Sequence, residues 1–196
     1  MAKTLEFYFD VGSPAAYLAW TLVPHLAAAT GAQVDYKPFL LGGVFQATGN
    51  RSPMEVPAKG SYMLGDLQRF AGRYGVTFRH NPYFPLNTLT LMRGAIGLQM
   101  RAPAQMKPYV DAVYRAIWVD ARDMNDPATV GAVLQQAGLD PQQLLALAAD
   151  PEVKEKLKAV TQEAVARGVF GAPTFFVAKD MFWGQDRLDF VKEALQ

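Results

Sequence analysis

A serine close to the N-terminus combines residue type and position in a way that suits chemistry. Ser13 stands between Gly12 and Pro14 and follows an apolar, aromatic run at residues 5–9. That run predicts a buried strand, Gly12 permits a sharp turn, and serine followed by proline is typical of the N-cap and first position of a helix. The hydroxyl would therefore lie at the positive end of a helix dipole, where anions are stabilised.

The chain has few residues that could support other kinds of site chemistry. It contains no cysteine, which excludes disulfides, thiolate-bound metal and a protein thiol nucleophile. His25 and His80 are the only histidines, too few for us to expect a histidine zinc site or a serine–histidine triad. Because no base lies in its motif, Ser13 is a poor nucleophile. We therefore expect no metal, and a serine that binds rather than attacks.

Composition narrows the class of protein. With 196 residues, 51% of them hydrophobic, the chain is one domain or one domain with a large insertion. Lys and Arg number 19 against 18 Asp and Glu, with no basic block, which argues against a nucleic-acid partner. No apolar run reaches the roughly 20 residues of a membrane span, and there is no signal-peptide core. We expect a soluble, cytoplasmic protein without membrane contact.

The elements that would position Ser13 are expected in the order β-α-β, then helices, then β-β-α. A helix is predicted at 15–29 and a second strand at 32–39, in which Pro38 marks an end or an edge. Residues 40–57 predict a long irregular segment, and residues 81–88 an aromatic, turn-rich one. Further helices are predicted at 59–74, 87–100, 105–119, 127–137, 141–149 and 151–167. The chain should end with a turn and strand at 169–177, a hairpin strand at 181–183 and a helix at 187–195.

Several motifs resemble one family in order and spacing between residues 5 and 190. The run Phe-Asp-Val-Gly-Ser-Pro at 9–14, followed by Ala-Tyr-Leu-Ala at 16–19, resembles the start of kappa-class glutathione transferases and of their relatives, the 2-hydroxychromene-2-carboxylate isomerases. Further matches are Gly49-Asn50, Pro57 with Lys59-Gly60 and Tyr62, Gly-Ala-Pro-Thr-Phe at 171–175, and Phe-Trp-Gly-Gln-Asp-Arg-Leu at 182–188.

The resemblance implies an α/β, thioredoxin-like fold with a large all-helical insertion. Ser13-Pro14-Ala15-Ala16 stands where that fold usually carries Cys-x-x-Cys. The thioredoxin-like domain would be discontinuous, formed by residues 1–48 and 168–196, and the helical insertion would cover residues 49–167.

The resemblance also implies glutathione as the cofactor. A cysteine-free chain with this fold must take its thiol from a bound molecule. A helix N-terminus can lower a thiol pKa well below ~8.5, so that the thiolate dominates near neutral pH. Ser13 would donate a hydrogen bond to the glutathione sulfur, because its oxygen can cap the helix while its proton stays free. The alternative is that Ser13 only caps the helix.

Pro173 and the residue before it form the second expected part of the site. Only about 5–6% of X–Pro bonds are cis, but the resemblance implies a cis bond between Ala172 and Pro173. The main chain of Ala172 would then face outward and pair with the cysteinyl backbone of glutathione, as an added strand would.

Four further residues are expected to recognise the charges of glutathione. The resemblance implies that Lys59 binds the glycyl carboxylate and that Asn50 contacts the tripeptide. Gln185 and Asp186 are predicted to cap the last helix, whose free N–H groups suit the γ-glutamyl carboxylate, and the Asp186 carboxylate suits the ammonium group. Each has a structural alternative, as a solvated lysine, a turn asparagine or a plain helix cap.

A second substrate needs a hydrophobic, partly polar pocket. Residues 41–46 and 81–88 are the candidates for its walls. The candidate substrate-binding residues are Phe45, Tyr83, Phe84 and Asn87, of which Asn87 would be the polar contact. Tyr114 and Trp118 lie at helical spacing and are expected to pack in the core instead.

The resemblance implies a glutathione-dependent isomerisation of intermediates of aromatic degradation. In the family reaction, 2-hydroxychromene-2-carboxylate and trans-o-hydroxybenzylidenepyruvate interconvert by reversible addition of the thiolate, and glutathione is not consumed. A kappa-class glutathione transferase or peroxidase, which consumes glutathione, is the alternative. A non-catalytic thioredoxin-like binding module is a third hypothesis. We expect a small aromatic carboxylate as substrate and, from the family, a homodimer.

Overall fold

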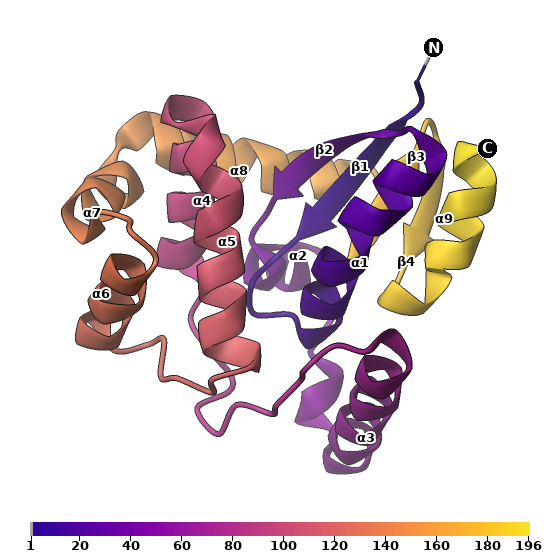
Figure 1. The fold of residues 1–196 in the computed structure, drawn as a ribbon, viewed down its shortest axis with the longest axis horizontal. Helices are drawn as coiled ribbons and strands as arrows, with labels where there is room; N and C mark the ends of the chain where they lie inside the picture. The colour runs from indigo at the N-terminus through magenta and orange to yellow at the C-terminus, as the bar shows by residue number, and fades with distance from the viewer. Residues whose placement is uncertain (1) are drawn as a thin grey trace.

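The computed structural model describes residues 2–196 and has a four-stranded sheet at its centre (Figure 1). The strands are β1 (Thr4–Phe9), β2 (Gln33–Pro38), β3 (Thr174–Val177) and β4 (Asp180–Trp183), in the spatial order β2-β1-β3-β4. β2 runs parallel to β1, β3 antiparallel to β1, and β4 antiparallel to β3. The predicted α/β fold with its β-α-β and β-β-α ends is confirmed, and Pro38 does end an edge strand.

Helices surround this sheet along the described part of the chain. The α-helices are α1 (Pro14–Thr30), α2 (Leu41–Thr48), α3 (Pro57–Tyr74), α4 (Leu89–Arg101), α5 (Pro103–Trp118), α6 (Pro127–Gln136), α7 (Pro141–Ala149), α8 (Pro151–Ala166) and α9 (Leu188–Leu195). Two 3-10 helices are η1 (Pro53–Glu55) and η2 (Gln185–Arg187). The helices predicted between residues 59 and 167 all begin and end within two residues of the prediction.

Alternate side chains of β1 face helices on opposite sides of the sheet, as strand geometry requires. The rings of Phe7 and Phe9 pack against Trp20 of α1, with centroids 6.2 and 5.0 Å apart. Tyr8 points to the other side, and its hydroxyl donates to Glu163 of α8 at 2.9 Å. α8 therefore contacts the sheet although it falls in the range predicted as insertion. The division into two domains stays a prediction.

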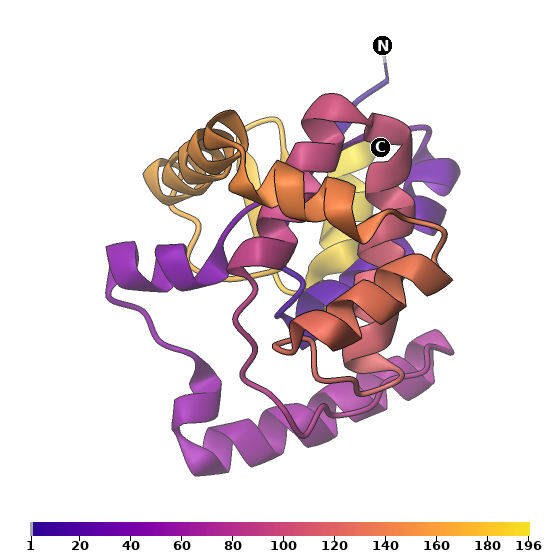
Figure 2. The ribbon, with the colours of Figure 1, turned by 90° about the vertical axis from the view of Figure 1, so that its left-hand side faces the viewer.

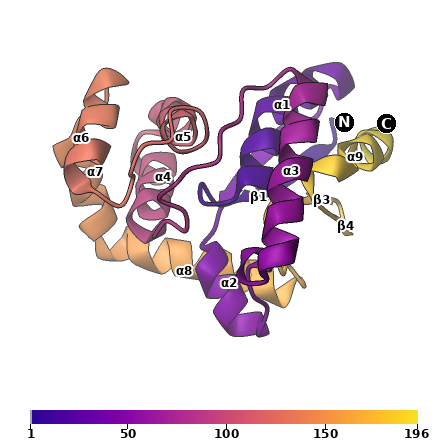
Figure 3. The same ribbon diagram turned by 90° about the horizontal axis from the view of Figure 1, so that it is seen from below.

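The remaining helices lie beside and below this layered core. α4 and α5 lie next to the sheet, with α6 and α7 on their outer side (Figure 1). α3 crosses the underside of the molecule (Figures 2 and 3). One hydrophobic cluster runs from the sheet through α1 into α4 and α5, so the helices are packed as part of a continuous core. No helix within residues 2–196 has both the length and the apolar character required to cross a membrane.

Residues 40–57 correct the prediction of a long irregular segment, because they contain α2 and η1. Paired glycines give the start of α2 a low helix propensity, but tertiary contacts override it. Leu41 N donates to the Asp10 carboxylate at 2.8 Å, which satisfies an amide at the helix start. Gly43 packs closely on α8, since a Cβ there would lie 3.2 Å from Cγ2 of Thr161.

Candidate active site

The turn after β1 presents Ser13 at the start of α1. Ser13 N donates to the main-chain oxygen of Asp10 at 3.0 Å, which closes the turn. Its Oγ accepts from Ala16 N at 3.1 Å, so the predicted N-cap is confirmed, with Pro14 at the first helical position. Only 5% of the Ser13 surface is exposed. The hydroxyl is therefore a buried group held at a helix N-terminus.

The Ser13 proton is not free, which corrects the expectation from the sequence. Ser13 Oγ donates to the main-chain oxygen of Ala172 at 2.9 Å, across 159 residues of chain. The Ala172–Pro173 bond is cis, as predicted. A second cis bond, Phe84–Pro85, was not predicted. A single hydroxyl thus caps α1 and joins it to the loop before β3.

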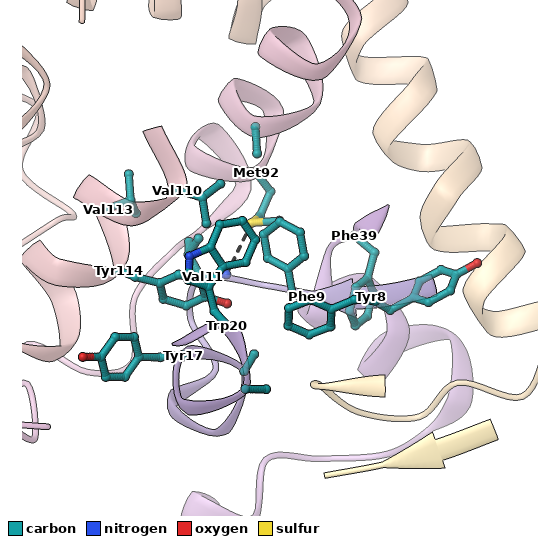
Figure 4. Packing of buried hydrophobic residues seen from close by; sticks show 14 of the residues in the cluster. Tyr8, Phe9, Val11, Tyr17, Trp20, Phe39, Met92, Val110, Val113 and Tyr114 are labelled. Atoms are coloured by element: carbon teal, nitrogen blue, oxygen red, sulfur yellow. Dashed lines mark hydrogen bonds between the residues drawn. The ribbon is translucent and has the colours of Figure 1, made fainter. Parts of the chain in front are cut away.

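Side chains from the helices hold the main chain of the same turn. Val11 N donates to the sulfur of Met92 at 3.4 Å (Figure 4). Val11 O accepts from Trp118 Nε1 at 2.9 Å. The Tyr114 hydroxyl donates to the main-chain oxygen of Asp10 at 3.3 Å. Tyr114 and Trp118 are almost completely buried, which confirms their predicted packing role. In addition, they satisfy polar groups of the turn that precedes Ser13.

The loop at residues 170–173 joins further predicted glutathione contacts to Ser13. Asn50 Nδ2 donates to the main-chain oxygen of Phe170 at 2.8 Å. Gly184 N donates to the main-chain oxygen of Pro173 at 3.0 Å. Asn50 and the start of η2 therefore lie next to the loop whose Ala172 oxygen meets Ser13.

Gln185 and Asp186 do not cap the last helix, which corrects another prediction. They belong to η2, and α9 begins only at Leu188, with Arg187 at its N-cap and no capping side chain. The Asp186 carboxylate instead pairs with the Arg187 guanidinium at 2.7 Å. Gln185 is buried, and its main-chain oxygen accepts from Tyr74 of α3 at 3.4 Å. The intervening 3-10 turn is the physical reason for the difference.

Lys59 lies exposed in the first turn of α3. Within residues 2–196 no hydrogen bond or ion pair joins it to Ser13 or to the loop at 170–173. Its predicted role in binding a carboxylate stays a prediction.

The four predicted substrate residues lie on two segments and differ in exposure. Phe45 is half-buried on α2, and Tyr83 is 51% exposed. The Phe84 ring packs on Trp118, with centroids 5.8 Å apart. Asn87 is exposed, and its Oδ1 accepts from the amide two residues further on, at the start of α4. Their roles in a substrate pocket stay predictions.

Asp10, which is 1% exposed, had no predicted role. Its Oδ1 accepts from Gly12 N at 2.9 Å, and its Oδ2 accepts from Leu41 N at 2.8 Å and from Thr88 Oγ1 at 3.1 Å. Burial raises the pKa of Asp10 above its ordinary value, and the three hydrogen bonds oppose that rise. The available signal was an acidic residue at the end of a mostly apolar strand, directly before the Ser13 turn.

Known proteins resemble this chain over its whole length. The model of the DsbA-like thioredoxin domain matches residues 4–196. A 2-hydroxychromene-2-carboxylate isomerase of Sphingobium xenophagum is 36% identical, over 100% of this chain and 99% of its own length. Glutathione S-transferase kappa 1 of Homo sapiens is 25% identical, over 100% of this chain and 92% of its own length.

A solved structure of a 2-hydroxychromene-2-carboxylate isomerase superimposes with a TM-score of 0.81 at 31% identity, covering 98% of this chain and 94% of that one. Both the sequence and the fold of this chain are therefore similar to those of 2-hydroxychromene-2-carboxylate isomerases along almost the full length. The chain belongs to the DsbA-like thioredoxin family, and over its full length it is similar to 2-hydroxychromene-2-carboxylate isomerases.

Proposed function

We propose that this protein is a glutathione-dependent isomerase that interconverts 2-hydroxychromene-2-carboxylate and trans-o-hydroxybenzylidenepyruvate. One observation carries the proposal: a buried serine hydroxyl at the N-terminus of α1, hydrogen-bonded to the Ala172 main chain, in a chain without cysteine. The 36% identity to a relative of that name, over the whole chain, supports the reaction. The kappa-class relatives support glutathione as the thiol.

The chemistry of the available groups fits glutathione, an anionic peptide that carries a thiol. Ser13 offers a hydroxyl at the positive end of a helix. Ala172 offers a main-chain oxygen that can accept from a peptide N–H. Asn50, Lys59 and Asp186 would meet the charged and polar ends of the tripeptide, and Gln185 lies beside Asp186 in η2. When bound, glutathione would supply a thiolate whose reversible addition to a conjugated carbon turns the double bond into a rotatable single bond, and whose departure restores the double bond.

Ser13 would change its hydrogen-bond acceptor when the thiolate binds. Its bond to the Ala172 oxygen joins two neutral groups and contributes about 1 kcal/mol, whereas a bond to a charged acceptor contributes about 1.5–3 kcal/mol. Rotation of the hydroxyl toward the sulfur is therefore favourable. The Ala16 amide can keep its bond to Oγ during the exchange. The freed Ala172 oxygen would then accept from the peptide backbone of the ligand.

The same relatives support an aromatic carboxylate as the second substrate. α2 and the segment at 81–88 would form its pocket, because both meet Asp10, three residues before Ser13. The family resemblance further leads us to propose a cytoplasmic homodimer, which sedimentation and cell fractionation would test.

A turnover assay that counts glutathione tests the function directly. Purified protein should catalyse the isomerisation of 2-hydroxychromene-2-carboxylate with glutathione present in less than stoichiometric amount, and omission of glutathione should abolish the rate. Titration of free thiol before and after many turnovers should give the same value.

Other results would lead to a different function. Loss of one glutathione per turnover would favour a kappa-class transferase or peroxidase, which the similarity to glutathione S-transferase kappa 1 also supports. Isomerisation that proceeds equally well without glutathione would contradict the proposed cofactor. Binding of glutathione without any turnover of aromatic substrates or peroxides would favour a binding module.

A further inference from the structure

The three hydrogen-bond donors on Asp10 come from three parts of the proposed site. Gly12 belongs to the turn that presents Ser13. Leu41 is the first residue of α2, one of the two segments proposed to contact the aromatic substrate. Thr88 ends the other segment and is the N-cap residue of α4. A single carboxylate therefore joins the turn that holds the thiol-binding serine to both proposed substrate segments.

Close packing reinforces this connection. A Cβ on Gly12 would lie 2.9 Å from Cγ2 of Thr88, closer than two carbons can approach. The turn and the start of α4 can therefore touch only because residue 12 has no side chain. Thr88 is itself 8% exposed, so water does not separate the two segments.

A charged acceptor suits this position better than a neutral one. An ionised carboxylate accepts all three hydrogen bonds, whereas the NH2 group of an asparagine would face at least one of the same donors. Within residues 2–196 no cation pairs with Asp10, and burial of a carboxylate without a cation opposes folding. Because the buried Asp10 carboxylate opposes folding, its presence is better explained by the way it positions the three segments that donate to it.

We propose that Asp10 is a positioning residue that fixes the two substrate segments relative to Ser13, so that its link to Thr88 governs the binding of the aromatic substrate. This inference rests on the proposed function and assigns Asp10 and Thr88 a part in it. Asp10 touches neither substrate nor thiol in this role. It acts through α2, the start of α4 and the turn.

Replacement of Thr88 by valine isolates one arm of the connection. The substitution keeps the shape of the side chain and removes only the hydrogen bond to Oδ2. The KM for 2-hydroxychromene-2-carboxylate at saturating glutathione should rise about tenfold, the scale of one lost hydrogen bond to a charged group. The Kd for glutathione and the pKa of its bound thiol should not change, because the bonds at Gly12 and Ser13 remain. Thr88→Ser should restore the KM.

Thr129→Val is the matched control. Thr129 Oγ1 also donates to an aspartate, Asp126 Oδ2, at 2.7 Å, but this hydrogen bond is exposed at the start of α6. This variant should leave KM and the glutathione Kd unchanged. Asp10→Asn should also raise KM, because its NH2 group faces at least one of the three donors. If Asp10→Asn does not fold, the two threonine variants still decide the question.

The outcomes separate this inference from the proposed function. An active enzyme in which Thr88→Val has the KM of the wild type would overturn the role of Asp10 and leave the isomerase intact. An equal loss in glutathione binding and KM would also overturn it, because it would indicate a general structural defect. If the wild type is inactive, hydrogen exchange decides. Thr88→Val should then speed exchange at the start of α4 and at the Leu41 amide, Thr129→Val should not, and equal exchange in the two would refute the connection.

Discussion

Four α-helices in the described residues begin with a polar cap followed by proline, yet only one of these starts belongs to the proposed site. Asp126, Asp140 and Asp150 cap α6, α7 and α8 through the amides that follow them. Ser13 caps α1 in the same way. The motif by itself is therefore a device for starting helices.

Burial and a hydrogen bond that its hydroxyl donates distinguish Ser13 from the other three caps. Asp126 and Asp140 are exposed, whereas Ser13 is 5% exposed and also donates to Ala172. A carboxylate at position 13 would accept hydrogen bonds but donate none, and it would repel a bound thiolate. The hydroxyl can cap the helix and still donate a proton to an anion.

The largest effect is expected from Ser13→Ala. Loss of a hydrogen bond to a charged sulfur should lower kcat/KM roughly ten- to a hundredfold and raise the pKa of bound glutathione by about one to two units. Loss of the cap should also lower the free energy of unfolding by about 1 kcal/mol. Ultraviolet titration of the thiolate and steady-state kinetics measure the first two, and urea unfolding measures the third. If the thiol pKa and kcat/KM of Ser13→Ala equal those of the wild type, Ser13 is only a helix cap like the other three.

Lys59→Ala should have a smaller effect, confined to glutathione binding. Lys59 is exposed in the first turn of α3, a helix with no side-chain cap. Removal of one exposed charge partner for a carboxylate should raise the glutathione Kd about fivefold, with kcat at saturation unchanged. Calorimetric titration of both proteins gives the ratio. Lys158→Ala on α8, also an exposed helix lysine, is the control, and equal affinities in the two variants would contradict the role of Lys59.

Asp140→Ala should affect stability alone. The carboxylate of Asp140 accepts from Gln142 N at 2.9 Å at the start of α7. Its loss should lower the free energy of unfolding by about 1 kcal/mol, while kcat/KM and glutathione affinity stay as in the wild type. Urea unfolding and kinetics on the same preparation test this. A fall in glutathione affinity would contradict the prediction that Asp140, unlike Ser13, is only a helix cap.

The smallest effect concerns the pH dependence of the Asp126 cap. Hydrogen bonds from the Thr129 side chain and from the Thr129 and Ala128 amides hold the pKa of Asp126 below its ordinary value. Because the folded pKa is the lower one, Asp126 stabilises the fold above the unfolded pKa of about 3.9. This contribution is lost as the pH falls through the folded pKa.

Asp126→Asn retains a capping oxygen but does not titrate there. The stability advantage of the wild type over this variant should therefore shrink between about pH 5 and about pH 3. Urea unfolding across that range measures it. A difference that stays constant would mean that the cap acts without its charge.

The local signals in the sequence predicted the helices and strands well. The run at residues 5–9, the cap–proline pairs and the helical spacing around Tyr114 each depend on residues a few positions apart. The prediction of an irregular segment at 40–57 was wrong because two glycines follow Leu41 at the start of α2, and the helix start is held by Asp10, 31 residues away from Leu41. Family motifs, rather than periodicity, led to Ala172 and Pro173 as site residues.

By itself, the sequence determined where α1 begins and that its N-cap residue, Ser13, carries a hydroxyl, because capping and proline geometry are local. Only the tertiary structure decided what that hydroxyl meets. Its acceptor on Ala172 is 159 residues away, and the Thr88 that joins the same turn through Asp10 is 78 residues away from that carboxylate. Contacts over such separations depend on how the sheet and helices pack. The packed core therefore decides three features: the acceptor of the Ser13 proton, the hydrogen bonds to Asp10, and the start of α2.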